Sequence, residues 1–314
     1  SRPPGSHLGS PRRICTFRRN RKTGTSGDHA RPGNRIGDRR VGGMSGVIND
    51  FDFAHFPHEY LAVQPIKIIP GGKSLAKSSD RLIRLERQLN REANALFKTE
   101  EYKRFFGTRL TKKRAQFYMI NRATFVLGRR ACWAYVQARA PFDVKQLIWQ
   151  HEEDELAGNK ERGVADHLTL GIEEGKSVGL TKRDFAKAKP CDGSQICSYA
   201  WQHAADRLPW LAGAALLGAL EIANADGIIK GGGMSHRMAH KLKDELGIPF
   251  SRQPSNRDHM DVEDEHSKFL YAVAKRHMKS KDDYDTILHG ARTTWAINKT
   301  WLRLMTVEMQ AMPN

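Results

Sequence analysis

Residues 258–273 read DHMDVEDEHSKFLYAV, and their spacing predicts a helix that buries polar groups. His259, Glu263 and His266 stand at positions i, i+4 and i+7, which places them on one face of a helix. That face continues through apolar residues, which are Val262, Phe269, Leu270 and Val273. We therefore expect the face to point inward, where two imidazoles and a carboxylate form a ligand set for iron, manganese or zinc. A solvated acidic helix with incidental histidines is the simpler alternative.

A second buried carboxylate is expected at Glu221, near the end of an apolar segment. Residues 211–223 read LAGAALLGALEIA, and Glu221 shares a helical face with Leu217. Burial of a lone carboxylate is unfavourable by several kcal/mol unless a cation or a hydrogen-bond network compensates its charge. A metal ion would provide that compensation, and a salt bridge to an arginine such as Arg207 is the alternative.

The third signal is an acidic run that is followed by a histidine. Residues 149–158 read WQHEEDELAG, and His167 opens the next helical segment after a loop. A glutamate and a histidine placed in this way could close on the same ion. The run leaves the glutamate ligand open among Glu152, Glu153 and Glu155, and we favour Glu155, then Glu152.

Helical periodicity dominates the chain from residue 78 onward. Helices are predicted from residue 78, over about 111–138, from 144 until Gly158, and over about 165–178, 181–188, 196–206, 209–230, 235–246, 258–279 and 283–310. Alternating β-branched residues are nearly absent, and only residues 63–69 are candidates for a short strand. The sequence thus predicts one all-α domain over residues 78–314, larger than a four-helix bundle.

The positive charge of the chain is concentrated near its beginning. The 314 residues carry a formal net charge of +17, of which +9 falls within residues 1–43 and +8 in the rest. We expect residues 1–43 to be a disordered basic leader of non-native or upstream origin, and residues 44–77 to be an N-terminal extension. A basic arm that binds nucleic acid or anionic lipid is the competing interpretation.

No segment of the sequence predicts a membrane span or a secretory signal. The longest apolar window, residues 208–220, is shorter than the roughly 20 residues that a membrane helix needs. In the absence of an export signal we expect free thiols and take the cytoplasm as the default location. We accordingly expect no membrane partner and no specific nucleic-acid partner.

Taken in chain order, the polar groups resemble a known ligand pattern. The order is a Glu and a His, then a lone Glu in an apolar helix, then His-x-x-x-Glu-x-x-His. This order resembles the ligand pattern of the haem-oxygenase-like di-iron oxidases, which belong to the TenA/PqqC-like helical superfamily. The resemblance covers roughly residues 80–300. The resemblance implies a haem-oxygenase-like bundle of about seven or more helices that binds two iron ions, Fe(II) or Fe(III), and uses O2 as co-substrate. The implied ligands are His167, Glu221 and Glu155 or Glu152 for one iron, and His259, Glu263 and His266 for the other. The middle residue of the last motif departs from the family, where it is usually Asp.

The resemblance also implies a class of reaction. It predicts that the protein oxidises a small amine, amino-acid or fatty-acid-like metabolite in a biosynthetic role. The reaction would be N-oxygenation, C–C cleavage or desaturation. The resemblance is also compatible with an external electron donor and with a homodimer. Candidate substrate-binding residues are Tyr118, Arg122, Phe125 and Trp201, with plain core packing as their alternative role. Two other functions are kept open, namely a cofactorless TenA/PqqC-like enzyme and a non-catalytic basic helical protein that binds nucleic acid.

Overall fold

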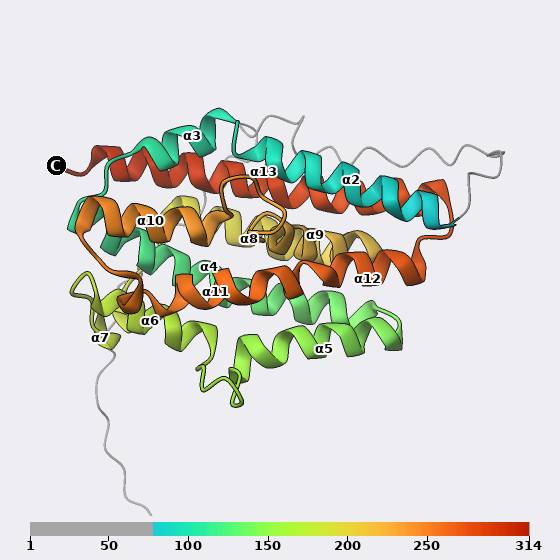
Figure 1. The fold of residues 1–314 in the computed structure, drawn as a ribbon, viewed down its shortest axis with the longest axis horizontal. Helices are drawn as coiled ribbons and strands as arrows, with labels where there is room; N and C mark the ends of the chain where they lie inside the picture. The colour runs from blue at the N-terminus through green and yellow to red at the C-terminus, as the bar shows by residue number, and fades with distance from the viewer. Residues whose placement is uncertain (1–77, 314) are drawn as a thin grey trace, which may run out of the picture. The chain divides into compact units, whose positions relative to one another are not determined.

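The computed structural model describes residues 78–313, apart from the side chains of residues 78, 79 and 262–264. Within this part of the chain all regular elements are helical, which confirms the all-α prediction (Figure 1). The predicted leader, the predicted extension and the candidate strand at residues 63–69 lie outside the described residues. None of the described helices is long and apolar enough to cross a lipid bilayer.

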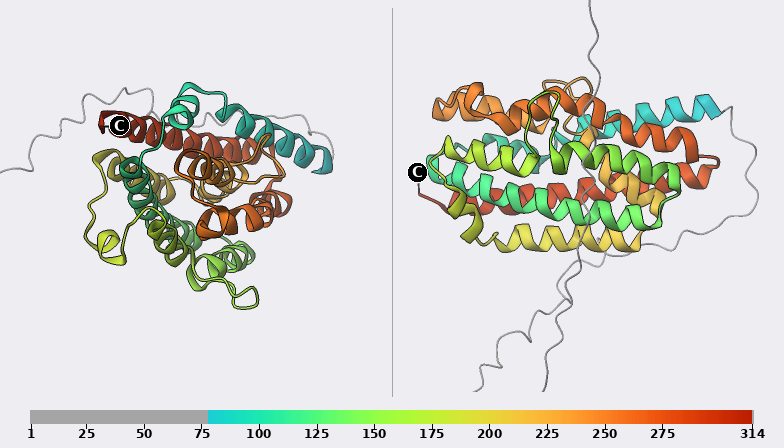
Figure 2. Two further views of the ribbon diagram at one scale, coloured as in Figure 1. Left: turned by 60° about the vertical axis from the view of Figure 1, so that its left-hand side comes forward. Right: turned by 90° about the horizontal axis from the view of Figure 1, so that it is seen from below.

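The helices follow the predicted pattern closely. They are α2 (Ser78–Leu96), α3 (Glu100–Gly107), α4 (Lys112–Arg139), α5 (Phe142–Ala157), α6 (His167–Lys176), α7 (Lys182–Lys187), α8 (Asp192–Arg207), α9 (Trp210–Ile222), α10 (Met234–Leu246), the 3-10 helix η2 (Phe250–Arg252), α11 (Pro254–His266), α12 (Lys268–His277) and α13 (Lys281–Ala311). The long helices α4 and α13 run along a common direction (Figure 2).

Two predicted helices differ from the structure. The helix expected over residues 209–230 ends at Ile222, because the side chains of Asn224 and Asp226 accept hydrogen bonds from backbone N–H groups at the start of α10 and so belong to a capping loop. The helix expected over residues 258–279 is two helices, α11 and α12, which are separated at Ser267.

Local signals in the sequence position α5 and α6 next to each other. Gly158 ends α5 with a φ of 71°, a conformation that favours glycine, and a Cβ there would lie 2.4 Å from the carbonyl oxygen of Val164. The Asp166 side chain then caps α6 by accepting from the N–H of Thr169. The tight loop therefore returns the chain so that His167 begins α6 close to the end of α5.

The apolar helix α9 forms the centre of the described core. Every residue from 211 to 222 is buried, because α9 packs against α13, α4, α11, α12, α2 and α8. The contact with α13 is especially close, since a Cβ on Gly290 would lie 2.0 Å from the carbonyl oxygen of Ala212. Glu221 on α9 is consequently placed deep inside the bundle, where it is only 2% exposed.

Candidate metal centre

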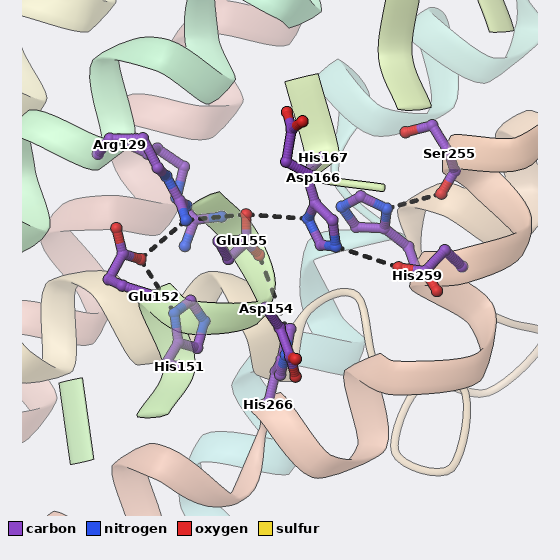
Figure 3. A network of polar contacts seen from close by, with 12 residues as sticks. Arg129, His151, Glu152, Asp154, Glu155, Asp166, His167, Ser255, His259 and His266 are labelled. Carbon is purple, nitrogen blue, oxygen red and sulfur yellow. Dashed lines mark hydrogen bonds and ion pairs between the residues drawn. The ribbon is translucent and has the colours of Figure 1, made fainter. Parts of the chain in front are cut away.

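A cluster of buried polar side chains lies among α4, α5, α6, α9 and α11 (Figure 3). The cluster contains nine ionisable side chains. They are the imidazoles of His151, His167, His259 and His266, the carboxylates of Glu152, Glu155 and Glu221, and the guanidinium groups of Arg129 and Arg130. The structure thus collects in one place every predicted ligand whose side chain it describes. Glu263 lies in α11, but its side chain is outside the described part of the chain.

The first group of ligand atoms comes from His151, Glu221 and His266, whose candidate atoms all lie within 4.8 Å of one another. Among the described residues, His151 Nε2 has no hydrogen-bond partner, although it lies 3.4 Å from Glu221 Oε1. Within the same part of the chain, both ring nitrogens of His266 are also buried without a partner. An unsatisfied buried polar group costs about 1–3 kcal/mol. Two imidazoles and a carboxylate that converge in this way form the ligand set typical of non-haem iron sites.

The second group comes from Glu155, His167 and His259. His167 Nδ1 lies 2.9 Å from Glu155 Oε2 without hydrogen-bond alignment, as expected for two atoms that face a common point rather than each other. The rings of His167 and His259 contact each other, with centroids 4.4 Å apart and ring planes tilted by 40°. His259 Nδ1 donates to the carbonyl oxygen of Ser255 at 2.7 Å, which leaves the lone pair on Nε2.

Glu155 links the two groups. Its Oε2 faces His167 in the second group, while its Oε1 is 3.9 Å from Nδ1 of His266 in the first group. The side chain is 5% exposed and is fixed on α5 between the two sets of imidazoles. A carboxylate with one oxygen toward each set is the arrangement that a bridge between two metal ions requires.

Two arginines on α4 compensate the charges of the carboxylates. Arg129 pairs with Glu221, and Arg130 Nη1 is 2.8 Å from both Glu152 Oε1 and Glu155 Oε2. A salt bridge to Glu221 therefore exists, but its arginine is Arg129 rather than Arg207.

The arginines also determine the protonation of the buried glutamates. Burial raises the pKa of Glu155 and of Glu221, but the cations beside them outweigh burial. Arg130 and His167 hold the pKa of Glu155 well below its usual range, and Arg129 and His151 do the same for Glu221. Both carboxylates are ionised at neutral pH, which is the form that binds metals.

The four imidazoles fall into two electrostatic classes. Burial lowers the pKa of His259 well below its usual value, with His167 contributing, and burial together with His151 lowers that of His266. Burial also opposes protonation of His167, but Glu155 and Asp258 outweigh it and raise the pKa of His167 to about 9. The pKa of His151 is raised by Glu152 and Glu221 against the effect of burial. A metal bound here would release protons from His151 and His167.

The structure groups the predicted ligands differently from the predicted assignment. It places Glu221 with His266 rather than with His167, and it places His259 with His167. Glu152 is turned toward Arg130 and toward His151 Nδ1, at 3.1 Å, so that it orients the His151 ring.

His151 and Asp258 belong to the cluster but were not predicted from the sequence. His151 continues the buried positions Val144 and Ile148 at helical spacing and stands one turn before Glu155, which was a readable signal on α5. Asp258 Oδ2 lies 3.1 Å from His167 Nε2, and no pattern in the sequence predicts that contact between α11 and α6.

A cavity of about 80 Å³ adjoins both groups. Glu155, Glu221 and His259 form part of its wall, and Tyr118, Arg122 and Phe125 form another part. Three of the four predicted substrate-binding residues therefore line this cavity. Trp201 does not, because it packs against Phe125 at 4.7 Å between ring centroids and donates its N–H to the Thr294 hydroxyl.

Solved structures with the same arrangement of helices are distant in sequence. A protein from Shewanella denitrificans OS217, described as a domain of unknown function with a haem-oxygenase-like fold, aligns with a TM-score of 0.58 at 13% identity, over 76% of this chain and 95% of that one. A CADD-like protein of unknown function from Nostoc punctiforme PCC 73102 aligns with a TM-score of 0.59 at 14% identity, over 73% and 98%. The fold is haem-oxygenase-like.

The same comparisons place the protein no more narrowly than its fold. A TenA homologue from P. horikoshii OT3 aligns with a TM-score of 0.47 at 15% identity, over 75% of this chain and 99% of that one. No model of a known protein family matches the sequence, and no curated protein is similar to it. The haem-oxygenase-like bundle predicted from the ligand pattern is confirmed, and the activity has to be inferred from the site.

Proposed function

We propose that the protein is a non-haem iron oxidase or oxygenase that binds two iron ions in the buried cluster and uses O2 to oxidise a small metabolite. The observation that carries this proposal is His266, an imidazole buried beside His151 and Glu221, whose ring nitrogens make no hydrogen bond to any side chain that the structure describes. Native proteins rarely leave such a group unsatisfied. A bound cation would satisfy it and would complete the two-histidine, one-carboxylate set.

The donor set fits two ions. His151, Glu221 and His266 would hold one, Glu155, His167 and His259 the other, with Glu155 placed between them. Iron bound in these positions would supply the electrons that activate O2. The surrounding residues supply orientation, since Glu152, Asp258 and the carbonyl group of Ser255 each fix one imidazole ring.

The adjoining cavity supports a small substrate. Its volume of about 80 Å³ is several times the roughly 10–15 Å³ that one water molecule needs, so it favours a small amine or amino acid over a long fatty acid. Arg122 enters the cavity wall with one N–H donated to the Ser255 hydroxyl at 2.8 Å, and it is the group suited to a substrate carboxylate. Phe125 and Trp301 supply apolar walls that exclude water.

The iron content of the protein tests the proposal. After anaerobic loading with Fe(II) and removal of unbound metal, we expect about two irons per chain in the wild type. His266→Ala and His259→Ala should each lose iron, whereas His289→Ala, which changes an exposed histidine on α13, should not. Exposure of the loaded wild type to O2 should give a transient visible absorption. A wild type that stays iron-free after loading would refute the proposal.

A cofactorless enzyme is the second candidate. The ion pairs of Arg129 and Arg130 favour it, because they compensate the buried carboxylates without a metal. Under this alternative the oxidation of a substrate would persist in the presence of a strong chelator, whereas the di-iron enzyme would lose it.

A further inference from the structure

The outer face of α5 exposes a row of large apolar side chains. Phe142, Trp149 and Leu156 are 75%, 67% and 61% exposed, and their spacing of seven residues places them along one face of the helix. The other exposed residues of this face are Gln146, Gln150, Glu153 and Ala157, so it carries a single charge. Large apolar side chains that are exposed in a row along one helix face are typical of interaction sites.

We propose that this face is a homodimer interface, in which α5 packs antiparallel against α5 of a second copy around a twofold axis at Trp149. The row is symmetric about Trp149, with seven residues to Phe142 on one side and seven to Leu156 on the other. In an antiparallel pair centred on Trp149, each Phe142 therefore meets Leu156 of the partner subunit. A twofold interface requires this self-complementarity, because the same patch contributes from both copies.

The charges beside the row select the same register. Lys145 lies four residues before Trp149 and Glu153 lies four residues after it. An antiparallel pair of α5 helices centred on Trp149 brings Lys145 of each copy level with Glu153 of the partner subunit, so that this pairing occurs at two positions. A parallel pair would instead place like charges level with each other, which is unfavourable. Neither residue makes an ion pair within the part of the chain that the structure describes.

The proposed interface lies behind the metal-binding face of the same helix. His151 and Glu155 point inward from α5, opposite the exposed row. In Figure 1, α5 lies along the lower edge of the described helices, whereas α13 lies near the upper edge, next to α3 and α2. A residue on α13 therefore offers a control on a remote surface.

Sedimentation velocity of the full chain at rising concentration tests the proposal. We expect a monomer–dimer equilibrium in the wild type and at least a tenfold increase in the dimer dissociation constant in Leu156→Glu, because the charge would be desolvated in the seam. Val307 on α13 is 54% exposed, against 61% for Leu156, so Val307→Glu is a matched control. It should leave the monomer–dimer equilibrium unchanged. Circular dichroism checks that each variant is folded.

A charge exchange tests the register. Lys145→Glu and Glu153→Lys should each weaken the dimer, and the double variant should restore it. A wild type that stays monomeric, a dimer that survives Leu156→Glu, or a double variant weaker than both single variants would overturn the proposal. A monomer that instead associates through this row with lipid vesicles would also overturn it, in favour of membrane binding.

Discussion

Arg130 holds two of the three carboxylates of the cluster together. Its side chain is 13% exposed, and a single nitrogen contacts both Glu152 and Glu155 at 2.8 Å. A metal ion that binds Glu155 has to share this carboxylate with the guanidinium group or displace it. The arginine is therefore an internal cation that compensates these carboxylates without a metal and would weaken the binding of a metal ion at the proposed site.

Substitution Arg130→Met separates these two effects. With chelator present, the variant should be less stable by about 3–5 kcal/mol, because two buried carboxylates lose their partner. The rise in melting temperature on addition of Co(II) should be larger in the variant than in the wild type. Arg292→Met removes a more exposed pair with Glu92 and should change stability by about 1 kcal/mol or less, with no effect on the Co(II) shift. Equal Co(II) shifts in Arg130→Met and the wild type would contradict the role of Arg130.

The individual candidate ligands were only partly predictable from the sequence. The spacing of His259 and His266 and the isolation of Glu221 in an apolar helix are visible in the chain itself. The pairing of each ligand with its neighbours depends on how α5, α6, α9 and α11 cross, which periodicity does not encode. For the same reason the sequence did not show that Arg129 and Arg130 face the carboxylates.

At the scale of the elements, the close contact between α9 and α13 positions Glu221. Gly290 on α13 lies against the backbone of Ala212 on α9, where no side chain fits. Gly290→Ala should destabilise the protein by about 1–3 kcal/mol, since the neighbouring atom is a backbone carbonyl that cannot rotate away. A Cβ added at Gly171 on α6 has no neighbouring atom within 4 Å, so Gly171→Ala should stabilise the protein by up to about 1 kcal/mol. Urea unfolding of both variants measures the difference, and equal stabilities would contradict the packing described.

A buried carboxylate joins α6 to α11 and gives stability a pH dependence. Glu174 accepts from the backbone N–H of Asn256 in the first turn of α11, and burial raises its pKa above the usual value of 4.5. Because the folded state holds this proton more tightly, the contribution of Glu174 to stability falls as pH rises from 4.5 through the raised pKa. Glu174→Gln keeps an acceptor for Asn256 but does not titrate. Its melting temperature relative to the wild type should therefore increase with pH across that range, and a constant difference would refute this.

Helix positions were predicted well because their signals are local. Thr111 caps α4 and Gly158 ends α5 as the sequence indicates. The separate helix α3 and the interruption at Ser267 were not predicted, since the surrounding residues remain compatible with continuous helix. Such boundaries depend on tertiary contacts rather than on the residues at the boundary.

At the scale of the whole molecule, one helix connects two proposals. The inner face of α5 contributes His151 and Glu155 to the cluster, and its outer face carries the row centred on Trp149. The haem-oxygenase-like fold brings these residues together, and the polar cluster is where we propose that the chemistry takes place. The net charge of +17 says little about the proposed site, because more than half of the charge falls within residues 1–43.

Anomalous diffraction at the iron absorption edge is the most direct test of the proposed di-iron centre. The crystals would be grown anaerobically and loaded with Fe(II). We predict two iron peaks inside the bundle, one among His151, Glu221 and His266 and the other between His167 and His259, with Glu155 reaching both. Iron peaks confined to the protein surface, or no iron peak between α5 and α11, would contradict the proposed di-iron centre.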